Sequence, residues 1–583
     1  MDETRIIERG GRRWSIRPVA AGPLLADGWP PDDPARLVAV KRGHRRAVFR
    51  FETGGCGYYL KVYEPADPFR RLRARLGLGP GRREWDALQA ARAAGLDVPE
   101  PVALRHGPEE ALVTREVPGG RRLDEVLFDE VFEAGPADPP YPGARPPELV
   151  AVFRTRRRPA PEGVIAPADL ARLLADLVHH LARADLYLPD LHPGNILISG
   201  SPAAWRLSLV DLAEAVCPAP SEAVLKHLVQ LEHFFEPIAS AAERVRCLAR
   251  LRELAGETPA AGDVPTADDV ARATAAYRQR FYPGRDRRTQ RESKYFSRIR
   301  VGRWRGWAAA DWADAVRAFL EAGGDGDPVA RAEAAPLKEG RTSAVWRVRL
   351  ADGRWVIVKR HRRAADAGPV AGALVPSRSA TGLRRGHMLL VRGIATARPA
   401  AAVDLRRRGV VTDTLLVTEP VDDALPLADW LRGGPTPAAR HHVTWRLARM
   451  LRRMHEAGLA HRDLKAPNIL VAGAHGPRPE PVLVDLDGLR RGRQVPARRR
   501  VRDLMRLSVS LDEWGVARRT DRLRFLRVYL GAPGCPRPMA VAGRHRGRTD
   551  AARRLRQWWT RLARSSARKI EALRRQRPEF EWP

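Results

Sequence analysis

Two neighbouring segments carry most of the information in this sequence: HRDLKAPNIL at residues 461–470 and PVLVDLDG at residues 481–488. Phosphoryl transfer to a hydroxyl needs a carboxylate that orients the attacking group and two oxygen ligands that hold Mg²⁺ on the nucleotide. Asp463, Asn468 and Asp485 supply these three groups in the expected order. Lys465 would neutralise charge on the transferred phosphoryl group. The two segments therefore predict a catalytic loop followed by a metal-binding aspartate.

An internal repeat places a lysine upstream of this loop twice. Lys61 and Lys359 each lie in a short apolar run of strand type, and each run follows a glycine-containing turn, at Gly43 and Gly340. A glycine occurs 34 residues after each lysine, at Gly95 and Gly393. Equal spacing of features in the same order indicates a duplicated unit. We expect both lysines to hold the phosphates that are not transferred.

The first copy has its own loop, DLHPGNIL at residues 190–197, and its own aspartate after the next apolar run. Asp190 is the predicted catalytic carboxylate of this copy, and Asn195 and Asp211 are its predicted metal ligands. Glu84 is the predicted carboxylate partner of Lys61. In the second copy, Glu419 ends the strand that leads toward the loop and is predicted to contribute to the nucleotide site.

The two copies depart from a full kinase pattern in different places. Glu84 lies 23 residues after Lys61, whereas the residue 23 after Lys359 is Gly382, and no glutamate occurs between Lys359 and Glu419. Another carboxylate would have to pair with Lys359. Conversely, the first copy has Leu188-Pro189 where the second has His461-Arg462, and His192 where the second has Lys465.

The repeat predicts an α+β protein made of two tandem protein-kinase-like domains, each with a small β-rich lobe and a larger α-rich lobe. The domains are placed at 1–255, with a proline-rich insertion at about 134–163, and at 331–583. Residues 256–330 are a basic, aromatic connecting segment, either an anion-binding surface or a solvated helical face. Apolar residues spaced three and four apart predict one helix before each loop, at 170–181 and 443–454.

Composition limits the class of partner without choosing one. The chain has 583 residues and a formal charge of +34, and 8 of its 103 basic residues are Lys while 95 are Arg. Such a bias reflects either GC-rich coding or attraction of an anionic partner. A glycolipid phosphate, an acidic membrane surface and nucleic acid would all be attracted, and nucleic acid rests on charge alone.

The four cysteines lie far apart without the spacing of a zinc site, so neither a disulfide framework nor a metal cluster is predicted. No basic stretch followed by an apolar run opens the chain, and no run of 18 apolar residues occurs. We expect a cytoplasmic protein with a peripheral contact at the inner-membrane surface and no transmembrane segment.

The motifs HRDLKAPNIL and VLVDLDG resemble those of the Kdo/WaaP family of lipopolysaccharide kinases, a branch of the protein-kinase-like fold. Residues 501–507 and 521–530 are also similar to that family, so the resemblance covers most of 335–535. It implies transfer of the γ-phosphate of ATP to a sugar hydroxyl of a glycolipid, with Mg²⁺, at the cytoplasmic membrane face. The first copy resembles the family more weakly, because DLHPGNIL also occurs in aminoglycoside-phosphotransferase-like kinases.

Two other functions remain open at this stage: a small-molecule or protein kinase, and a pseudokinase scaffold that binds nucleotide without transferring phosphate. Nothing similar to an Ala-Pro-Glu segment follows either metal aspartate, which disfavours a regulated protein kinase. Because the loop acts where charge develops in the transition state, the more complete loop of the second copy predicts that this copy carries the activity.

Overall fold

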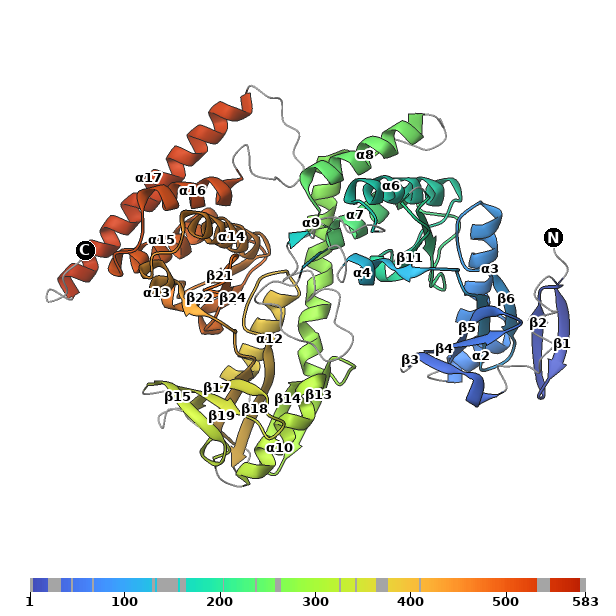
Figure 1. Ribbon diagram of the computed structural model, residues 1–583, viewed down its shortest axis with the longest axis horizontal. Coiled ribbons are helices and arrows are strands. Elements are labelled where there is room, and N and C mark those ends of the chain that lie inside the picture. The colour runs from blue at the N-terminus through green and yellow to red at the C-terminus, as the bar shows by residue number, and fades with distance from the viewer. Residues whose placement is uncertain are drawn as a thin grey trace. The chain divides into compact units, whose positions relative to one another are not determined.

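The computed structural model describes residues 4–18, 33–42, 46–64, 68–127, 132–133, 156–157, 164–202, 204–235, 239–256, 264–324, 327–340, 343–362, 376–407, 410–531 and 546–576. The chain combines helices with several sheets, as the sequence predicted (Figure 1). It divides into two compact units, and each is described by itself. Unit 1 is formed mainly by residues 1–133 and 157–275, and unit 2 mainly by residues 276–537 and 542–583.

Unit 1 contains a seven-stranded antiparallel sheet with the strand order β1-β2-β6-β7-β5-β4-β3. Its strands are β1 (Arg5–Arg9), β2 (Arg12–Ile16), β3 (Val38–Arg42), β4 (Arg46–Thr53), β5 (Cys56–Tyr63), β6 (Pro101–Arg105) and β7 (Ala111–Arg115). Large side chains on one face of β2, β4 and β5, among them Trp14, Phe51 and Tyr58, form its core.

Unit 2 contains a second seven-stranded antiparallel sheet, with the order β13-β14-β18-β19-β17-β16-β15. Its strands are β13 (Phe296–Val301), β14 (Trp304–Ala309), β15 (Glu333–Glu339), β16 (Ser343–Arg349), β17 (Trp355–Arg362), β18 (Pro399–Arg407) and β19 (Val410–Thr418). Taken in chain order, the strands of the two units occupy the same places in their sheets.

The two units are also similar in the helices that follow β5 and β17, the strands that hold Lys61 and Lys359. In unit 1, α2 (Pro68–Arg75) and α3 (Pro80–Ala93) follow β5, and in unit 2, α12 (Arg378–Leu390) follows β17. Pro80 occupies the first turn of α3, where the missing N–H costs nothing. Ser377 begins α12 by accepting a hydrogen bond from the backbone N–H of Ala380. The helix α10 (Ala313–Gly323) packs beside β13 and β14 through Val316, Phe319 and Leu320.

Part of the predicted connecting segment, residues 296–309, forms two strands of the second sheet. β13 is the edge strand of that sheet and β14 lies next to it, and Phe296, Ile299 and Trp304 point into the core of unit 2. The basic, aromatic run at 278–288 ends α9 (Ala267–Asp286). There Asp286 is buried and forms ion pairs with Arg392, 2.6 Å away, and Arg491, 2.8 Å away. Part of this run therefore has a packing role in unit 2.

The helical part of unit 1 is built from α6 (Pro167–Arg183), α7 (Ala223–Phe235) and α8 (Ala241–Gly256), with the short α4 (Leu123–Val126) beside them. A three-stranded sheet orders β12 (Arg206–Leu209), β11 (Ile196–Ser199) and β8 (Arg121–Arg122). The predicted apolar stripe is confirmed, since Leu170, Leu174, Leu177, Val178 and Leu181 of α6 are buried. β9 (Phe132–Glu133) and β10 (Arg156–Arg157) form a separate two-stranded sheet. The rest of the predicted insertion at 134–163 lies outside the described residues.

The helical part of unit 2 repeats this arrangement and adds a long final helix. Its helices are α13 (Leu427–Arg432), α14 (Pro437–Glu456), α15 (Ala497–Glu513), α16 (Arg519–Leu530) and α17 (Arg546–Gln576). Its short strands are β20 (Leu425–Pro426), β21 (Leu459–His461), β22 (Ile469–Ala472), β23 (Glu480–Leu483) and β24 (Leu489–Arg491). The apolar stripe of α14 is buried as predicted. Gly458 ends this helix at φ 77°, in the left-handed region.

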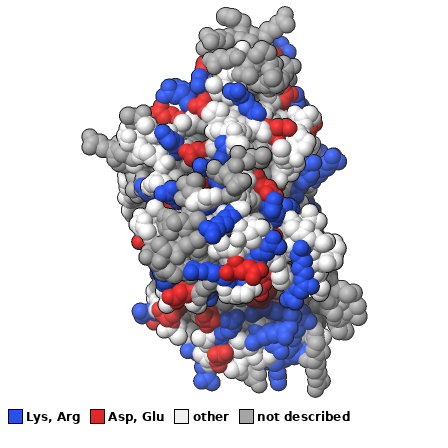
Figure 2. Space-filling view, turned by 90° about the vertical axis from the view of Figure 1, so that its right-hand side faces the viewer, with Lys and Arg blue, Asp and Glu red and all other residues white. Residues whose placement is uncertain are grey.

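None of the described helices is both long and apolar enough to cross a membrane. On the face drawn in Figure 2, basic and acidic side chains are interspersed over much of the surface, and basic ones predominate toward its lower end.

Candidate functional site

In unit 2 the predicted catalytic residues lie on the loop between β21 and β22. The Lys465 Nζ is 2.8 Å from Asp463 Oδ1, and both side chains are about half exposed. The Asn468 side-chain N–H donates to the backbone carbonyl of Asp463 over 2.8 Å, which leaves the amide oxygen of Asn468 available as a ligand. The backbone N–H of Val484 donates to the Asn468 carbonyl over 2.9 Å. Asp463, Lys465, Asn468 and the segment before Asp485 are thus connected.

Buried polar side chains fix the ends of this loop. Asp503, on α15, is fully buried and accepts a hydrogen bond of 2.8 Å from the His461 backbone N–H. Burial lowers the pKa of His461, so its ring stays neutral at neutral pH. The ring accepts from the Asp463 N–H at Nδ1 and donates from Nε2 to the Asp485 carbonyl, 3.0 Å away. His461 therefore joins the loop to the predicted metal aspartate.

Lys359 contacts two carboxylates that follow β23. Its Nζ is 2.7 Å from Asp485 Oδ1 and 2.9 Å from Asp487 Oδ2. Burial opposes the charge of Lys359, but the two carboxylates outweigh it and raise the pKa of the ammonium. Asp485 adopts a left-handed conformation, with φ 55°. Asp487 had no predicted role, yet it supplies Lys359 with a carboxylate partner that α12 lacks.

Gly382 lies on α12, 23 residues after Lys359, whereas Glu84 lies 23 residues after Lys61 in unit 1. A Cβ atom there would lie 2.7 Å from a methyl group of Leu416, so α12 approaches β19 closely at this point. From the same helix, the Arg385 guanidinium donates to the backbone carbonyls of Leu486 and Asp487 over 3.2 and 3.0 Å. This helix therefore supports the Asp485–Asp487 segment through an arginine.

The remaining predicted residues of unit 2 have different surroundings. Glu419 is buried, 2.5 Å from Arg398 Nη1 and 2.7 Å from the indole N–H of Trp312. Burial raises the pKa of Glu419 against the effect of Arg398. The Gly340 backbone N–H donates to the Ser343 carbonyl over 2.9 Å. Gly43, its counterpart in unit 1, lies outside the described residues.

In unit 1 the sequence-predicted lysine pair is formed. Lys61 Nζ makes an ion pair and hydrogen bond with the carboxylate of Glu84, which is fully buried on α3. The Tyr63 hydroxyl donates to the same carboxylate. Burial, reinforced by the Glu84 charge, raises the pKa of Tyr63 well above its ordinary value, so Tyr63 remains a donor. Glu84 is thereby held by two side chains of β5.

The loop of unit 1 repeats the backbone pattern of unit 2. The Asn195 side chain donates to the Asp190 carbonyl over 3.0 Å, and the Val210 N–H donates to the Asn195 carbonyl over 3.0 Å. Asp211 has φ 68°, matching the left-handed conformation of Asp485. His192 Nε2 lies 3.6 Å from the Asp190 carboxylate, where unit 2 has Lys465.

Two side chains of α7 hold this loop in place. His227 Nε2 accepts a hydrogen bond of 2.9 Å from the Leu188 N–H, and Gln230 bonds both the Leu191 N–H and the Pro189 carbonyl. Burial lowers the pKa of His227 to about 4. Leu188 and His461 both stand two residues before the predicted catalytic aspartate of their unit. His227 in unit 1 therefore holds the same backbone N–H position that Asp503 holds in unit 2.

The carboxylate of Asp211 is bonded by Arg46, the first residue of β4. One guanidinium nitrogen of Arg46 contacts Oδ1, and the second lies 2.7 Å from Oδ2. Burial would raise the pKa of Asp211, but the hydrogen bonds from Arg46 and the charge of Lys61 lower it. Asp211 is therefore an ionised, doubly bonded carboxylate.

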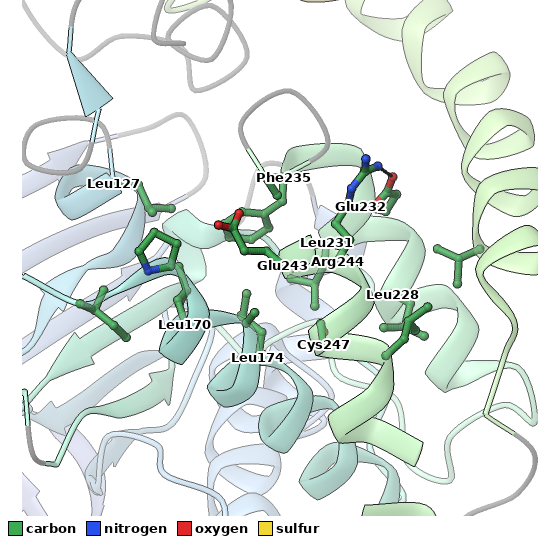
Figure 3. A pocket seen from close by; sticks show the side chains of 16 residues that line it. Leu127, Leu170, Leu174, Leu228, Leu231, Glu232, Phe235, Glu243, Arg244 and Cys247 are labelled. Carbon is green, nitrogen blue, oxygen red and sulfur yellow. Dashed lines mark hydrogen bonds and ion pairs between the residues drawn. The ribbon is translucent and has the colours of Figure 1, made fainter. Parts of the chain in front are cut away.

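Each unit also has an apolar cavity among its helices, away from these residues. The one in unit 1 has a volume of about 90 Å³ and is lined by α6, α7 and α8, including Leu170, Leu174 and Leu228 (Figure 3). The one in unit 2, of about 350 Å³, is lined by Val443, Leu447 and Leu504 at corresponding positions. Neither lining includes a predicted site residue.

Comparison with known proteins gives the family. The sequence profile of the lipopolysaccharide kinase (Kdo/WaaP) family matches residues 377–529. The 3-deoxy-D-manno-octulosonic acid kinase of Xanthomonas campestris pv. campestris is 35% identical over 188 residues, which cover 30% of this chain and 70% of that enzyme. The chain therefore belongs to the lipopolysaccharide kinase (Kdo/WaaP) family, as the motifs predicted.

Two further proteins are similar over different extents. The lipopolysaccharide core heptose(I) kinase WaaP of Escherichia coli K12 is 32% identical over 127 residues, 21% of this chain and 47% of that enzyme. The match thus spans about half the length of that relative. A solved structure of WaaP in complex with acyl carrier protein aligns with 43% of this chain and 95% of its own, with 24% identity and a TM-score of 0.31.

Proposed function

We propose that this protein is an ATP-dependent phosphotransferase, a kinase that moves the γ-phosphate to a hydroxyl of a lipopolysaccharide-type core sugar. We assign the reaction to unit 2. The observation that carries the proposal is the connection of Asp463, Lys465, Asn468 and Asp485 through one hydrogen-bonded loop, in a chain of the Kdo/WaaP family. The names of the relatives supply the class of acceptor.

Each residue of the loop has a chemical task in this proposal. The Asp463 carboxylate orients the sugar hydroxyl and accepts its proton as the oxygen attacks phosphorus. Lys465, 2.8 Å from that carboxylate in the structure, moves to the transferred phosphoryl oxygens when substrates bind and stabilises their charge. Lys359 holds the phosphates that remain on the nucleotide.

The donor atoms of unit 2 fit a divalent cation. Asp485 and Asp487 already converge on one cation, the Lys359 ammonium, and both are partly exposed. With the free amide oxygen of Asn468 they offer the hard oxygen ligands that Mg²⁺ prefers. When bound, Mg²⁺ would neutralise charge on the nucleotide phosphates.

The architecture assigned to this function is a pair of tandem protein-kinase-like domains with two lobes each. Its support is the identical strand order of the two seven-stranded sheets and the matching hydrogen bonds of the two loops. We place the reaction at the cytoplasmic face of the inner membrane, with an anionic glycolipid as acceptor, because ATP and the basic surface of the chain would meet the acceptor there.

The test is a phosphorylation assay with purified full-length protein, ATP, Mg²⁺ and core glycolipid that lacks its sugar phosphates. Asp463→Asn should lower turnover about 10²–10⁴-fold, because it removes the proton acceptor at constant volume. Asp190→Asn is the matched control in unit 1 and should leave the rate unchanged.

Undiminished turnover of the Asp463→Asn protein would refute the assignment to unit 2. Loss of product in Asp190→Asn alone would move the activity to unit 1, and loss of a different product in each variant would make both units enzymes. Phosphorylation of a protein or small sugar in preference to the glycolipid would replace the proposed acceptor.

A further inference from the structure

Arg46 holds Asp211, the carboxylate that a kinase-like site of unit 1 would use to bind a metal ion. Its guanidinium bonds both carboxylate oxygens of Asp211, and each side chain is only about one-quarter exposed, at 24% and 26%. Two parallel hydrogen bonds from a guanidinium satisfy a carboxylate as a bidentate pair. Asp211 therefore has few lone pairs left for a cation.

The register of the two sheets identifies the counterpart of Arg46. Val48 pairs with Lys61 in unit 1, and Val345 pairs with Lys359 in unit 2. Two residues earlier on the same strands, Arg46 corresponds to Ser343. Unit 1 thus has a cation where unit 2 has a short neutral side chain.

A second difference between the units lies two residues after the metal aspartate. Asp487 follows Asp485 in unit 2 and contacts Lys359, whereas Ala213 follows Asp211 in unit 1. Compared with unit 2, unit 1 therefore has one more positive charge and one fewer negative charge at the same site. Both differences disfavour a divalent cation, because fewer oxygen ligands remain and a fixed guanidinium repels it.

The same changes favour a phosphate group. A guanidinium binds phosphate oxygens through a planar pair of donors, and its charge is permanent. Lys61, paired in register with Val48 on the strand next to that of Arg46, brings a second cationic side chain to this part of unit 1. The donor set of Asn195 and Asp211 does not fit Mg²⁺ while Arg46 holds Asp211.

We propose that unit 1 binds a nucleoside triphosphate without a divalent cation, with the Arg46 guanidinium taking the place of the metal. The inference rests on the proposed function, because it takes unit 1 as a nucleotide site of the kinase-like kind. It deepens that function by making unit 1 a metal-independent nucleotide-binding unit, in contrast to the metal-dependent unit 2.

The test measures binding of ATP to full-length protein by calorimetry, with Mg²⁺ and with excess EDTA. Lys359→Met removes the phosphate contact of unit 2, so the remaining binding reports unit 1. We expect its Kd to change less than about threefold between the two conditions, a difference below about 0.7 kcal/mol. Adding Arg46→Ser should weaken binding in EDTA about tenfold or more, while Mg²⁺ restores part of it.

The reciprocal exchange supplies the control. Lys61→Met silences unit 1, and the remaining binding in unit 2 should require Mg²⁺. Ser343→Arg in that background should reduce the requirement, since it places the same side chain at the same register. Arg46→Lys keeps the charge but loses the second donor and should fall between wild type and Arg46→Ser. Thermal melting of each variant separates loss of binding from loss of fold.

Three results would overturn the inference: a strict Mg²⁺ requirement in the Lys359→Met protein, unchanged metal dependence in Arg46→Ser, or the absence of ATP binding to unit 1 in both conditions. The first would mean that Arg46 merely occupies the site until metal-nucleotide displaces it. If unit 2 still phosphorylates glycolipid in an Asp463-dependent manner, the proposed function survives each of these results. If no variant or wild-type protein transfers phosphate, the proposed function itself fails.

Discussion

Replacing Asp503 with Leu should destabilise the predicted catalytic loop of unit 2 by about 1–3 kcal/mol. The Asp503 carboxylate is fully buried, and its Oδ2 accepts the His461 N–H at 2.8 Å while the ring of His455 lies 3.4 Å away. Asp503→Leu leaves that N–H buried without an acceptor, which costs about 1–3 kcal/mol. Asp503→Asn retains a neutral acceptor oxygen, so its cost should be smaller, under about 1 kcal/mol.

Hydrogen exchange measures this difference locally. Because 1.4 kcal/mol corresponds to a factor of ten, amides of the segment around His461 should exchange about 5- to 150-fold faster in Asp503→Leu. Asp503→Asn should change exchange less than about fivefold. The kcat for phosphotransfer should fall in the same order, with the KM for ATP less affected, since Asp503 positions the loop and does not touch substrate.

His227→Leu is the matched control in unit 1, because it removes the acceptor of the Leu188 N–H. It should accelerate exchange around Leu188 and leave the His461 segment unchanged. Equal protection at His461 in wild type and Asp503→Leu would refute the reasoning, and so would a larger effect of Asn than of Leu.

Three further predictions concern stability. The pKa of His227 is about 4 in the folded chain and about 6.5 in the unfolded chain, so its contribution to the free energy of unfolding is complete above pH 6.5 and is lost as the pH falls toward 4. The free energy of opening α7, measured by hydrogen exchange, should drop by roughly 3 kcal/mol over that range. The drop should be smaller in His227→Gln. Gly458→Ala should destabilise unit 2 by more than about 1 kcal/mol in urea unfolding, because its Cβ would lie 2.4 Å from the Gly492 carbonyl oxygen at a positive φ; a neutral effect would contradict the clash. Arg392→Met should cost about 3 kcal/mol, since the buried Asp286 loses a bidentate partner, and adding Asp286→Asn should recover part of that loss in the same assay.

The sequence predicted the parts of the site whose residues are close along the chain. Asp463, Lys465 and Asn468 lie within six residues, and their spacing alone indicates one loop. The stripes of α6 and α14 were equally readable, because helical periodicity is a local property. The mixed helix-and-sheet class and the family followed from the same motifs.

Contacts between distant segments could not be predicted in this way. Arg46 and Asp211 are 165 residues apart, and no local pattern distinguishes Arg46 from the many other arginines of the chain. Asp503 lies in the segment 501–507 that resembles the Kdo/WaaP family, but only its buried position on α15 identifies it as the acceptor for the His461 N–H. The strands β13 and β14 were not predicted. In β13, exposed charged residues such as Arg298 and Arg300 lie between the buried ones, so the sequence of this edge strand is similar to that of a solvent-exposed segment.

The arginines of this chain, whose net charge is +34, fall into two groups in the fold. Some arginines form buried ion pairs: Arg392, Arg398 and Arg440 are mostly buried, and each pairs with a carboxylate. On α17, by contrast, the nine basic residues between 550 and 576 are all exposed and face two acidic ones, while Trp558 and its apolar neighbours pack against the rest of unit 2. Buried ion pairs create little field at a distance, because their charges cancel over a few ångströms. Attraction of an anionic glycolipid would therefore come from exposed surfaces such as α17, and the total arginine count overstates it.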